Sequence, residues 1–274
     1  MKSAVFASLL SATGLVLSQT LPQVTVSATR SEAAPFDVPA SVDVIDGEQL
    51  RSAGRPAINL SESLAFVPGV SARDRQNYAQ DMQLSIRGFG ARSTFGVRGV
   101  RIYVDGIPAT MPDGQGQLSN IDLTTAGRVE ILRGPFSALY GNSSGGVVQV
   151  FTETGEGKPV VTGSLAAGSY GLYRPGLRAS GSSQGLSYVV SANNLESDGW
   201  REHSAVSRGL ANARLDFKRS EGSDWTVVAN AIEMHADDPL GLTRAQFEAD
   251  PRSADPSATQ FNTRKSVRQE QLGL

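Results

Sequence analysis

Residues 128–152 restrict the fold more than any other part of the chain. Apolar and charged residues alternate over 128–132, which predicts a short half-buried strand that ends at Gly134 and Pro135. Residues 136–140 are expected to form a short helix, because proline suits a first helical turn and Gly141 suits a left-handed C-terminal cap. A glycine-rich turn then leads into a second strand over 147–151. Strand, helix and strand in so short a segment predict a small mixed α/β unit.

The residues before this segment predict a β-hairpin. Val100, Ile102 and Val104 occupy alternate positions, and Asp105 and Gly106 follow them directly. Asp-Gly is a preferred pair for the type I′ turn that joins two antiparallel strands.

Further upstream, residues 41–45 predict another strand, because Val42 and Val44 alternate with polar residues. Asp46 is expected to cap a following helix, with Gln49 three positions later. Asn59 and Glu62 repeat this capping pattern before a second short helix, whose apolar face would hold Leu60, Leu64 and Val67.

Three motifs stand in a fixed order along this region: IRGFG, VDGIP and VEILRGPFSALYGNSSGGVVQV. In this order and spacing they resemble the plug domain of TonB-dependent outer-membrane receptors, over about residues 23–152. The resemblance implies an α+β plug over residues 39–153, a small mixed sheet with short helices. The alternative is that the glycines and arginines only build turns and solvated edges of an ordinary α/β domain. That alternative explains each motif alone but not the ordered series.

The first residues predict a signal peptide. Lys2 supplies a positive charge, residues 4–17 are mostly apolar, and small residues before Gln19 suit cleavage, so we assign residues 1–18 to the signal. The alternative is a short buried helix. Export follows from the sequence, whereas the cell outer membrane as destination follows from the resemblance.

Residues 19–38 are expected to be an extended segment and a linker. An exposed, β-branched segment beside prolines can pair with a strand of another protein. The resemblance implies that this segment is the TonB box, which TonB recruits with its inner-membrane ExbB/ExbD complex. The alternative is a plain strand. The expected TonB-binding residues are Gln23, Val24, Thr25, Val26, Ser27 and Ala28.

Two loops flank the predicted hairpin and are candidates for substrate contact, since binding residues tend to lie on loops of a rigid scaffold. The resemblance implies that these apical loops face the extracellular vestibule. The alternative for each residue is a solvated loop position without a role. The candidates are Arg92, Phe95, Met111, Gln115 and Gln117.

Arg87 and Arg133 each precede a glycine. The resemblance implies that these arginines are buried against acidic residues of the barrel wall, because a buried guanidinium requires carboxylate partners. The alternative is that both are exposed edge charges.

The second half of the chain changes character after a linker over 153–157. Alternating apolar and polar residues over 160–167, 172–180, 186–190, 211–217 and 225–231, joined by turns of alternating length, are typical of outer-membrane β-barrels. The alternative is a soluble β-sandwich. We assign residues 158–274 to the first antiparallel strands of a transmembrane barrel in contact with outer-membrane lipid. Such receptors close about twenty-two strands, so with a last strand expected to begin near Gln271 the chain is expected to be an incomplete receptor.

Composition excludes other classes of function. A net charge of −2 gives no basic surface for nucleic acid, and the absence of cysteine excludes disulfides and cysteine metal sites. Neither a P-loop lysine motif nor a complete dinucleotide fingerprint is present. We expect no enzyme, no cofactor and no metal site. The resemblance implies energy-coupled uptake of a scarce substrate, first a ferric siderophore, with haem, cobalamin, copper or oligosaccharide as alternatives. A plug-containing fragment that does not transport is the remaining alternative.

Overall fold

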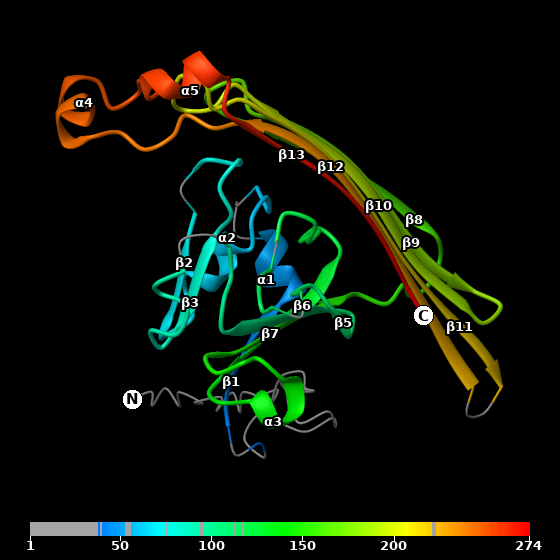
Figure 1. Cartoon of the computed structure of the whole chain (residues 1–274). Coiled ribbons are helices and arrows are strands. Elements are labelled where there is room, and N and C mark those ends of the chain that lie inside the picture. Colours follow the sequence, from blue (N-terminus) through cyan, green and yellow to red (C-terminus); the bar gives the residue numbers. More distant parts are fainter. Residues whose placement is uncertain are drawn as a thin grey trace, which may run out of the picture.

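The computed structural model describes residues 38, 40–52, 56–74, 76–93, 96–111, 113–116, 118–220 and 223–274. The predicted signal peptide and the predicted TonB box at residues 23–28 lie outside the described residues. The described chain has two parts, which we call the inner domain (residues 38–153) and the outer sheet (residues 160–273). The outer sheet curves over one side of the inner domain (Figure 1).

The inner domain is built on a five-stranded mixed sheet with the order β1-β6-β7-β4-β5. Only β4 and β7 run parallel to each other in this sheet, while its other neighbours are antiparallel. The strands are β1 (Ser41–Asp46), β4 (Val100–Val104), β5 (Ile107–Pro108), β6 (Ala126–Arg133) and β7 (Gly146–Thr152). A separate antiparallel pair consists of β2 (Val70–Arg73) and β3 (Gln83–Ile86). The short helices are α1 (Gly47–Ser52), α2 (Ser61–Leu64) and α3 (Ser137–Tyr140).

The glycine-rich turns confirm the predicted α+β arrangement. Asp105 and Gly106 have φ angles of 49° and 80°, as a type I′ turn requires, and Gly141 ends α3 with a φ of 71°. Gly146 starts β7 with a φ of 145°, and a Cβ atom there would collide with the carbonyl oxygen of Leu132. A glycine is therefore needed where β6 and β7 come together.

The two predicted helix caps have different outcomes. The Asp46 carboxylate accepts a hydrogen bond of 2.7 Å from the N–H of Glu48 at the start of α1, as predicted for a cap. The predicted pattern of Asn59 and Glu62 is confirmed only in its glutamate half: Glu62 accepts from the N–H of Asn59 at 2.9 Å, but Leu60 occupies the N-cap position and the Asn59 amide donates to Asp74. The Glu62 carboxylate accepts from the N–H groups of residues 57–59, at 2.8–3.0 Å, and so satisfies the donors that precede the helix.

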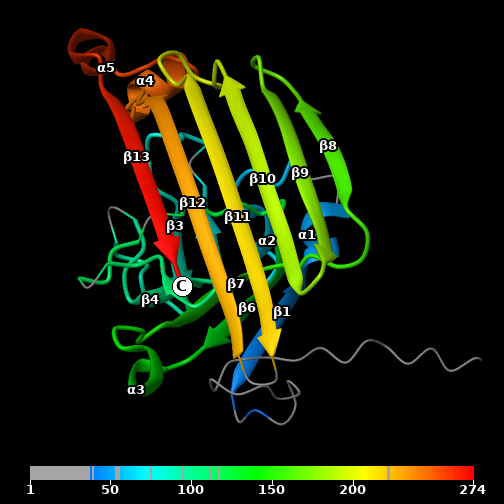
Figure 2. The ribbon, with the colours of Figure 1, turned by 90° about the vertical axis from the view of Figure 1, so that its right-hand side faces the viewer.

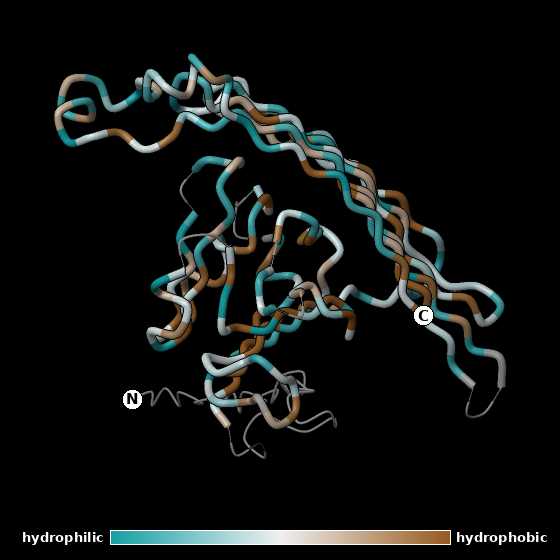
Figure 3. Tube along the Cα trace, in the orientation of Figure 1, coloured by the Kyte–Doolittle hydropathy of each residue, from teal (hydrophilic) through white to brown (hydrophobic). Residues whose placement is uncertain are grey.

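The core of the inner domain lies between its sheet and its helices. The predicted apolar face of α2 is confirmed, since Leu60, Leu64 and Val67 are buried in the same cluster as Ile102 and Ile131. Figure 3 shows the hydrophobic residues gathered along the central strands of this domain. The inner domain thus has a core of its own.

The outer sheet contains six antiparallel strands in sequence order (Figure 2). They are β8 (Val160–Ala167), β9 (Tyr173–Ser183), β10 (Leu186–Ser197), β11 (Val206–Ser220), β12 (Ser223–Asp237) and β13 (Arg264–Gly273). The long connection between β12 and β13 carries α4 (Arg244–Ala249) and α5 (Pro256–Phe261), two helices that the hydrophobic pattern does not predict. The prediction that the last strand begins near Gln271 is wrong, since β13 begins at Arg264. Its exposure alternates strictly, but the inward positions are mostly polar, so they give no apolar signal.

The outer sheet alternates between two unlike faces. Side chains that face the inner domain include the buried Asn193, Arg208 and Asn212. The opposite face exposes apolar side chains such as Leu165, Leu177, Trp225 and Leu272.

Among the described residues, no helix is long and apolar enough to cross a membrane.

Candidate functional site

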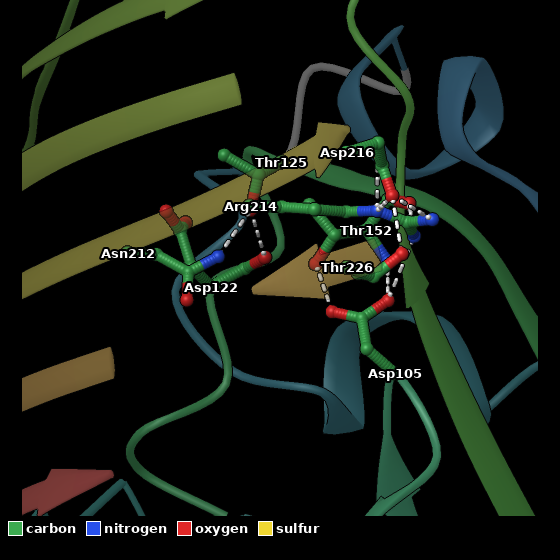
Figure 4. A network of polar contacts seen from close by, with 8 residues as sticks. All are labelled: Asp105, Asp122, Thr125, Thr152, Asn212, Arg214, Asp216 and Thr226. Carbon is green, nitrogen blue, oxygen red and sulfur yellow. Dashed lines mark hydrogen bonds and ion pairs between the residues drawn. The ribbon is translucent and has the colours of Figure 1, made fainter. Parts of the chain in front are cut away.

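Polar side chains dominate the contact between the inner domain and the concave face of the outer sheet. Figure 4 shows the part of this contact formed by Asp105, Asp122, Thr125, Thr152, Asn212, Arg214, Asp216 and Thr226. These residues come from loops and strand ends of the inner domain and from β11 and β12 of the outer sheet. The candidate site is this interface together with the loops at its upper end.

Asp105 connects the hairpin turn, β7 and the outer sheet. Its carboxylate accepts hydrogen bonds from the N–H and the hydroxyl of Thr152, at 2.8 Å and 2.6 Å. It also accepts from Arg214 on β11, at 3.2 Å, and its side chain is only 3% exposed (Figure 4). The turn that places Asp105 here is the one that the sequence predicts, whereas its partner Arg214 lies 109 positions away.

Arg214 binds both parts of the chain. Its guanidinium donates to the carbonyl oxygen of Thr152 at 2.8 Å and pairs with Asp216 of its own strand at 3.0 Å. Asp216 in turn accepts from the hydroxyl of Thr226 on β12, at 2.7 Å. One arginine is therefore held in place by the outer sheet while it contacts the inner domain.

A second group of contacts surrounds Asp122. Its carboxylate accepts from the hydroxyl of Ser191 on β10 at 2.5 Å. Nearby, Asn212 donates to the hydroxyl of Thr125 at 3.2 Å, and Asn230 donates to the carbonyl oxygen of Asn120 at 2.9 Å. Three neighbouring strands thus contact the same loop, residues 120–125, through neutral side chains.

The segment over residues 56–59 is held from two sides. Its N–H groups donate to Glu62, while the carbonyl oxygens of Pro56 and Ile58 accept from Arg174 and Arg208, at 3.0 Å and 3.3 Å. Both arginines are buried against the inner domain. The neighbouring Tyr78 is half-buried, and this burial raises the pKa of its hydroxyl, so the phenol is neutral at physiological pH.

At the upper end, the inner domain is joined to the base of the long β12–β13 connection. The Asp238 carboxylate accepts from the amides of Asn77 and Gln80, at 2.8 Å and 2.5 Å. Lys265, at the start of β13, pairs with Asp81 at 2.5 Å. Both ends of the long connection therefore contact the same short segment of the inner domain.

The structure brings the two predicted substrate loops together. Bridges join Val97 and Thr110 to Gly116, and the N–H of Met111 donates to the carbonyl oxygen of Gln115 at 2.7 Å. Arg92 and Met111 are exposed, and Gln115 is half-buried. The other two candidates, Phe95 and Gln117, lie outside the described residues. A substrate role for these residues stays a prediction.

The two arginines that precede glycines lie in unlike surroundings. Arg133 pairs with Asp43 of β1 at 2.5 Å and donates to the carbonyl oxygen of Pro68 at 2.7 Å, so its ionic partner is within the inner domain. Arg87 is exposed and has a φ of 50°. Contact of either one with a barrel wall stays a prediction. The ion pairs to the outer sheet that the structure shows were not predicted, and they join Arg214 to Asp105, Arg178 to Glu153 and Lys265 to Asp81.

Over the described part of the chain, no group of three or more His, Cys, Asp and Glu side chains could hold a metal ion. The interface is suited to docking of one part on another, because water can replace the partner of each polar group when the two parts separate.

Comparison with known proteins agrees with this arrangement. Residues 34–148 match the family described as TonB-dependent Receptor Plug Domain. The vitamin B12 transporter BtuB of Vibrio vulnificus is 31% identical over 152 residues, which cover 55% of this chain and 24% of the transporter. The ferrichrome outer membrane transporter/phage receptor of Escherichia coli is 27% identical over 230 residues, 82% of this chain and 27% of that protein.

Solved structures show the same fold. The unliganded ferric citrate transporter FecA is 26% identical with a TM-score of 0.66, and the match covers 80% of this chain and 35% of that chain. The chain thus spans about a quarter to a third of the length of these three relatives. Residues 34–148 therefore match the plug domain of TonB-dependent receptors, and the whole chain, with an unclosed antiparallel sheet that wraps this domain, is similar in fold to such receptors.

Proposed function

We propose that the protein takes part in energy-coupled uptake of a scarce substrate across the bacterial outer membrane. The observation that carries this proposal is the docking of a separately folded inner domain on the concave face of a curved sheet through exchangeable polar contacts. A domain held in this way closes a passage at rest and can be displaced without loss of its own core.

The energy would come from TonB. Gln23, Val24, Thr25, Val26, Ser27 and Ala28 would form the strand that pairs with TonB, which the ExbB/ExbD complex energises from the inner membrane. Substrate bound at the loops over residues 91–96 and 109–117 would make this segment available. The exposed apolar face of the outer sheet, with Leu165, Leu177 and Leu272, supports contact with outer-membrane lipid.

A ferric siderophore is the substrate class that we favour. Ferrichrome, ferric enterobactin and ferric citrate appear in the names of similar proteins, as do vitamin B12, hemin and copper. Haem, cobalamin, copper and oligosaccharide remain the alternatives. No group of three or more His, Cys, Asp and Glu side chains among the described residues favours copper.

The proposal is tested by deletion of residues 23–28 from the complete gene. Cells that lack other receptors would be supplied with a panel of labelled ferrichrome, ferric enterobactin, ferric citrate, cyanocobalamin and hemin. For the compound that is imported, the deletion should abolish uptake and leave binding to whole cells intact. Deletion of residues 29–34, which keeps the predicted box and shortens the linker by the same length, is the matched control. Unchanged uptake without residues 23–28 would refute energy-coupled transport through this segment.

A further inference from the structure

A cavity of about 240 Å³ lies between the inner domain and the strands β8, β9 and β10. Its lining includes Arg51, Pro56 and Thr124 of the inner domain and Arg174, Arg178 and Asn193 of the outer sheet. Three of the lining residues are arginines, and none carries a carboxylate. A water molecule occupies roughly 30 Å³ in the liquid, so the cavity has room for a small anion with several waters.

Arg174 carries a buried charge without a direct counter-charge. The side chain belongs to a residue that is only 5% exposed, and its guanidinium donates to the carbonyl oxygen of Pro56 at 3.0 Å. The negative charges of Asp122 and Glu62 act on it, but among the described residues it forms no ion pair, and its Nε–H has no acceptor. A buried guanidinium is costly unless an anion accompanies it.

The other two arginines of the cavity have only one acidic partner between them among the described residues. Arg178 and Arg51 both pair with one carboxylate, that of Glu153, and the Arg51 pair is long at 3.6 Å. Two of the three guanidinium groups therefore share a single contacting carboxylate, and within the described residues Arg174 contacts none. The field in the cavity favours an anionic occupant.

Asn193 adds a neutral donor to the same wall. It is 8% exposed, and neither atom of its side-chain amide has a hydrogen-bond partner in the described part of the chain. Asn212 on the next strand is buried to the same degree, at 7% exposed, and its amide donates to Thr125. Because the Asn193 amide has no hydrogen bond to lose, it is free to turn toward an anion in the cavity.

We propose that this cavity is an oxyanion-binding site for a carboxylate or phosphate group, held by Arg174, Arg178 and Asn193. Guanidinium groups recognise planar and tetrahedral oxyanions through charge-assisted hydrogen bonds. The site lies on the boundary between the inner domain and the outer sheet, where a substrate that passes the displaced domain would meet it. Binding of the anion does not depend on transport, whereas a role for the site in substrate passage rests on the proposed function.

Citrate and inorganic phosphate are the probes that test the site. They are titrated into the purified, complete receptor in detergent, and binding is followed by calorimetry and by the unfolding temperature Tm, against sodium chloride of equal ionic strength. Both anions should bind and raise Tm, because a ligand that binds only the folded state stabilises it. If neither citrate nor phosphate binds or raises Tm more than chloride does, the proposal is wrong.

Asn193→Leu separates this site from any other anion site on the receptor. The substitution removes an unpartnered buried amide, so Tm in chloride should rise, while the affinity for citrate should fall roughly tenfold through loss of one hydrogen bond to a charged group. The matched control Asn212→Leu removes the existing hydrogen bond from Asn212 to Thr125, so it should lower Tm and leave the affinity for citrate unchanged. Wild-type citrate affinity in Asn193→Leu would refute the assignment of the site.

Transport by cells identifies the source of the oxyanion. Lower uptake of the imported compound by Asn193→Leu, with unchanged binding to whole cells, would mean that a group of the substrate visits the site. Unchanged uptake together with weaker citrate binding would mean that a free anion from solution occupies it. Either result is independent of the deletion of residues 23–28, so failure of the oxyanion site and failure of energy-coupled transport are distinguishable.

Discussion

Removal of the negative charge of Asp105 should loosen the inner domain from the outer sheet. Asp105→Asn is the cleanest change, because asparagine accepts the left-handed conformation at φ 49° as readily as aspartate does. The type I′ turn between β4 and β5 should therefore persist. The effect of the variant should come from the side-chain contacts alone.

The size of the expected loss of stability follows from the three hydrogen bonds that the Asp105 side chain, only 3% exposed, accepts. The asparagine oxygen can still accept from the N–H of Thr152. The Thr152 hydroxyl loses its acceptor, and the bond from Arg214 loses the negative charge of its partner. A hydrogen bond to a charged group contributes about 1.5–3 kcal/mol. Arg214 keeps Asp216 and the carbonyl oxygen of Thr152, so the full 3–5 kcal/mol typical of a broken buried ion pair is not expected. We expect a loss of about 2–3 kcal/mol in the free energy of unfolding of the inner domain.

A double-mutant cycle measures the part of this loss that belongs to the ion pair. Asp105→Asn, Arg214→Gln and the double variant are compared by denaturant unfolding of the purified receptor, and the two changes should couple by about 1–2 kcal/mol. Arg268 and Glu270 form an exposed control pair, at 77% and 71% exposed, whose cycle should give a coupling near zero. Additive effects of the two changes, within about 0.5 kcal/mol, would refute the claim that this pair fastens the inner domain.

Two further predictions concern the upper loops. Asp238→Ala removes the acceptor of Asn77 and Gln80, so amide hydrogen exchange of residues 76–82 should become faster. The control Glu248→Gln affects the Arg244 pair on α4 and should leave this exchange unchanged. Equal exchange rates in both variants would show that Asp238 does not restrain the inner domain. Hydrogen bonds from Ser257 and then Gln246 hold the pKa of Asp255 below its ordinary value of 3.8, so the stabilisation of α5 is fully present above pH 3.8 and is lost as the pH falls through the lowered pKa. Exchange of the α5 amides against pH should show this acid transition in the wild type but not in Asp255→Asn, and its persistence in the variant would contradict the assignment.

Local turn chemistry explains why so much of the inner domain could be predicted. The Asp105-Gly106 turn, the Gly141 cap and the strand β7 after Gly146 each depend on residues within a few positions of one another. Such patterns act through the backbone conformations that glycine, aspartate and asparagine prefer, so they can be recognised from residue types alone. The antiparallel strands of the outer sheet were predictable for a similar reason, since a two-residue period is a local property.

Elements without an apolar period were missed. Three of the inward positions of β13 carry Lys265, Gln269 and Gln271, and Val267 is the one large apolar side chain among them, so the strand shows no apolar period. The signals for α4 and α5 were present as a capping box at Thr243 and Gln246 and as Asp255 before Pro256. Long loops often contain such short helices, and capping residues identify them better than hydrophobicity does.

The partners in the interface could not be predicted, for a different reason. Arg214 meets Asp105 across 109 positions and Lys265 meets Asp81 across 184. Which residues meet depends on the register of each strand and on the angle at which the inner domain rests on the sheet. Of the two arginines that the sequence singled out, Arg87 and Arg133, the second pairs within its own domain, because Asp43 lies on the strand next to it.

The distribution of apolar residues decides what displacement of the inner domain would require. Its two own clusters, around Leu64 and around Tyr103, contain no residue of the outer sheet. Among the described residues, the shared apolar cluster takes Ile58 and Ala79 as its buried members from the inner domain, with Tyr78 packed against it, and its other members belong to the outer sheet. The inner domain thus contributes far fewer apolar side chains to this shared patch than to its own core, and the polar contacts of Asp105, Asp122 and the segment 56–59 add to the attachment. Water can take over each of those polar contacts, but it cannot replace a hydrophobic core, so force applied to the inner domain should break its attachment to the sheet before it breaks the domain itself.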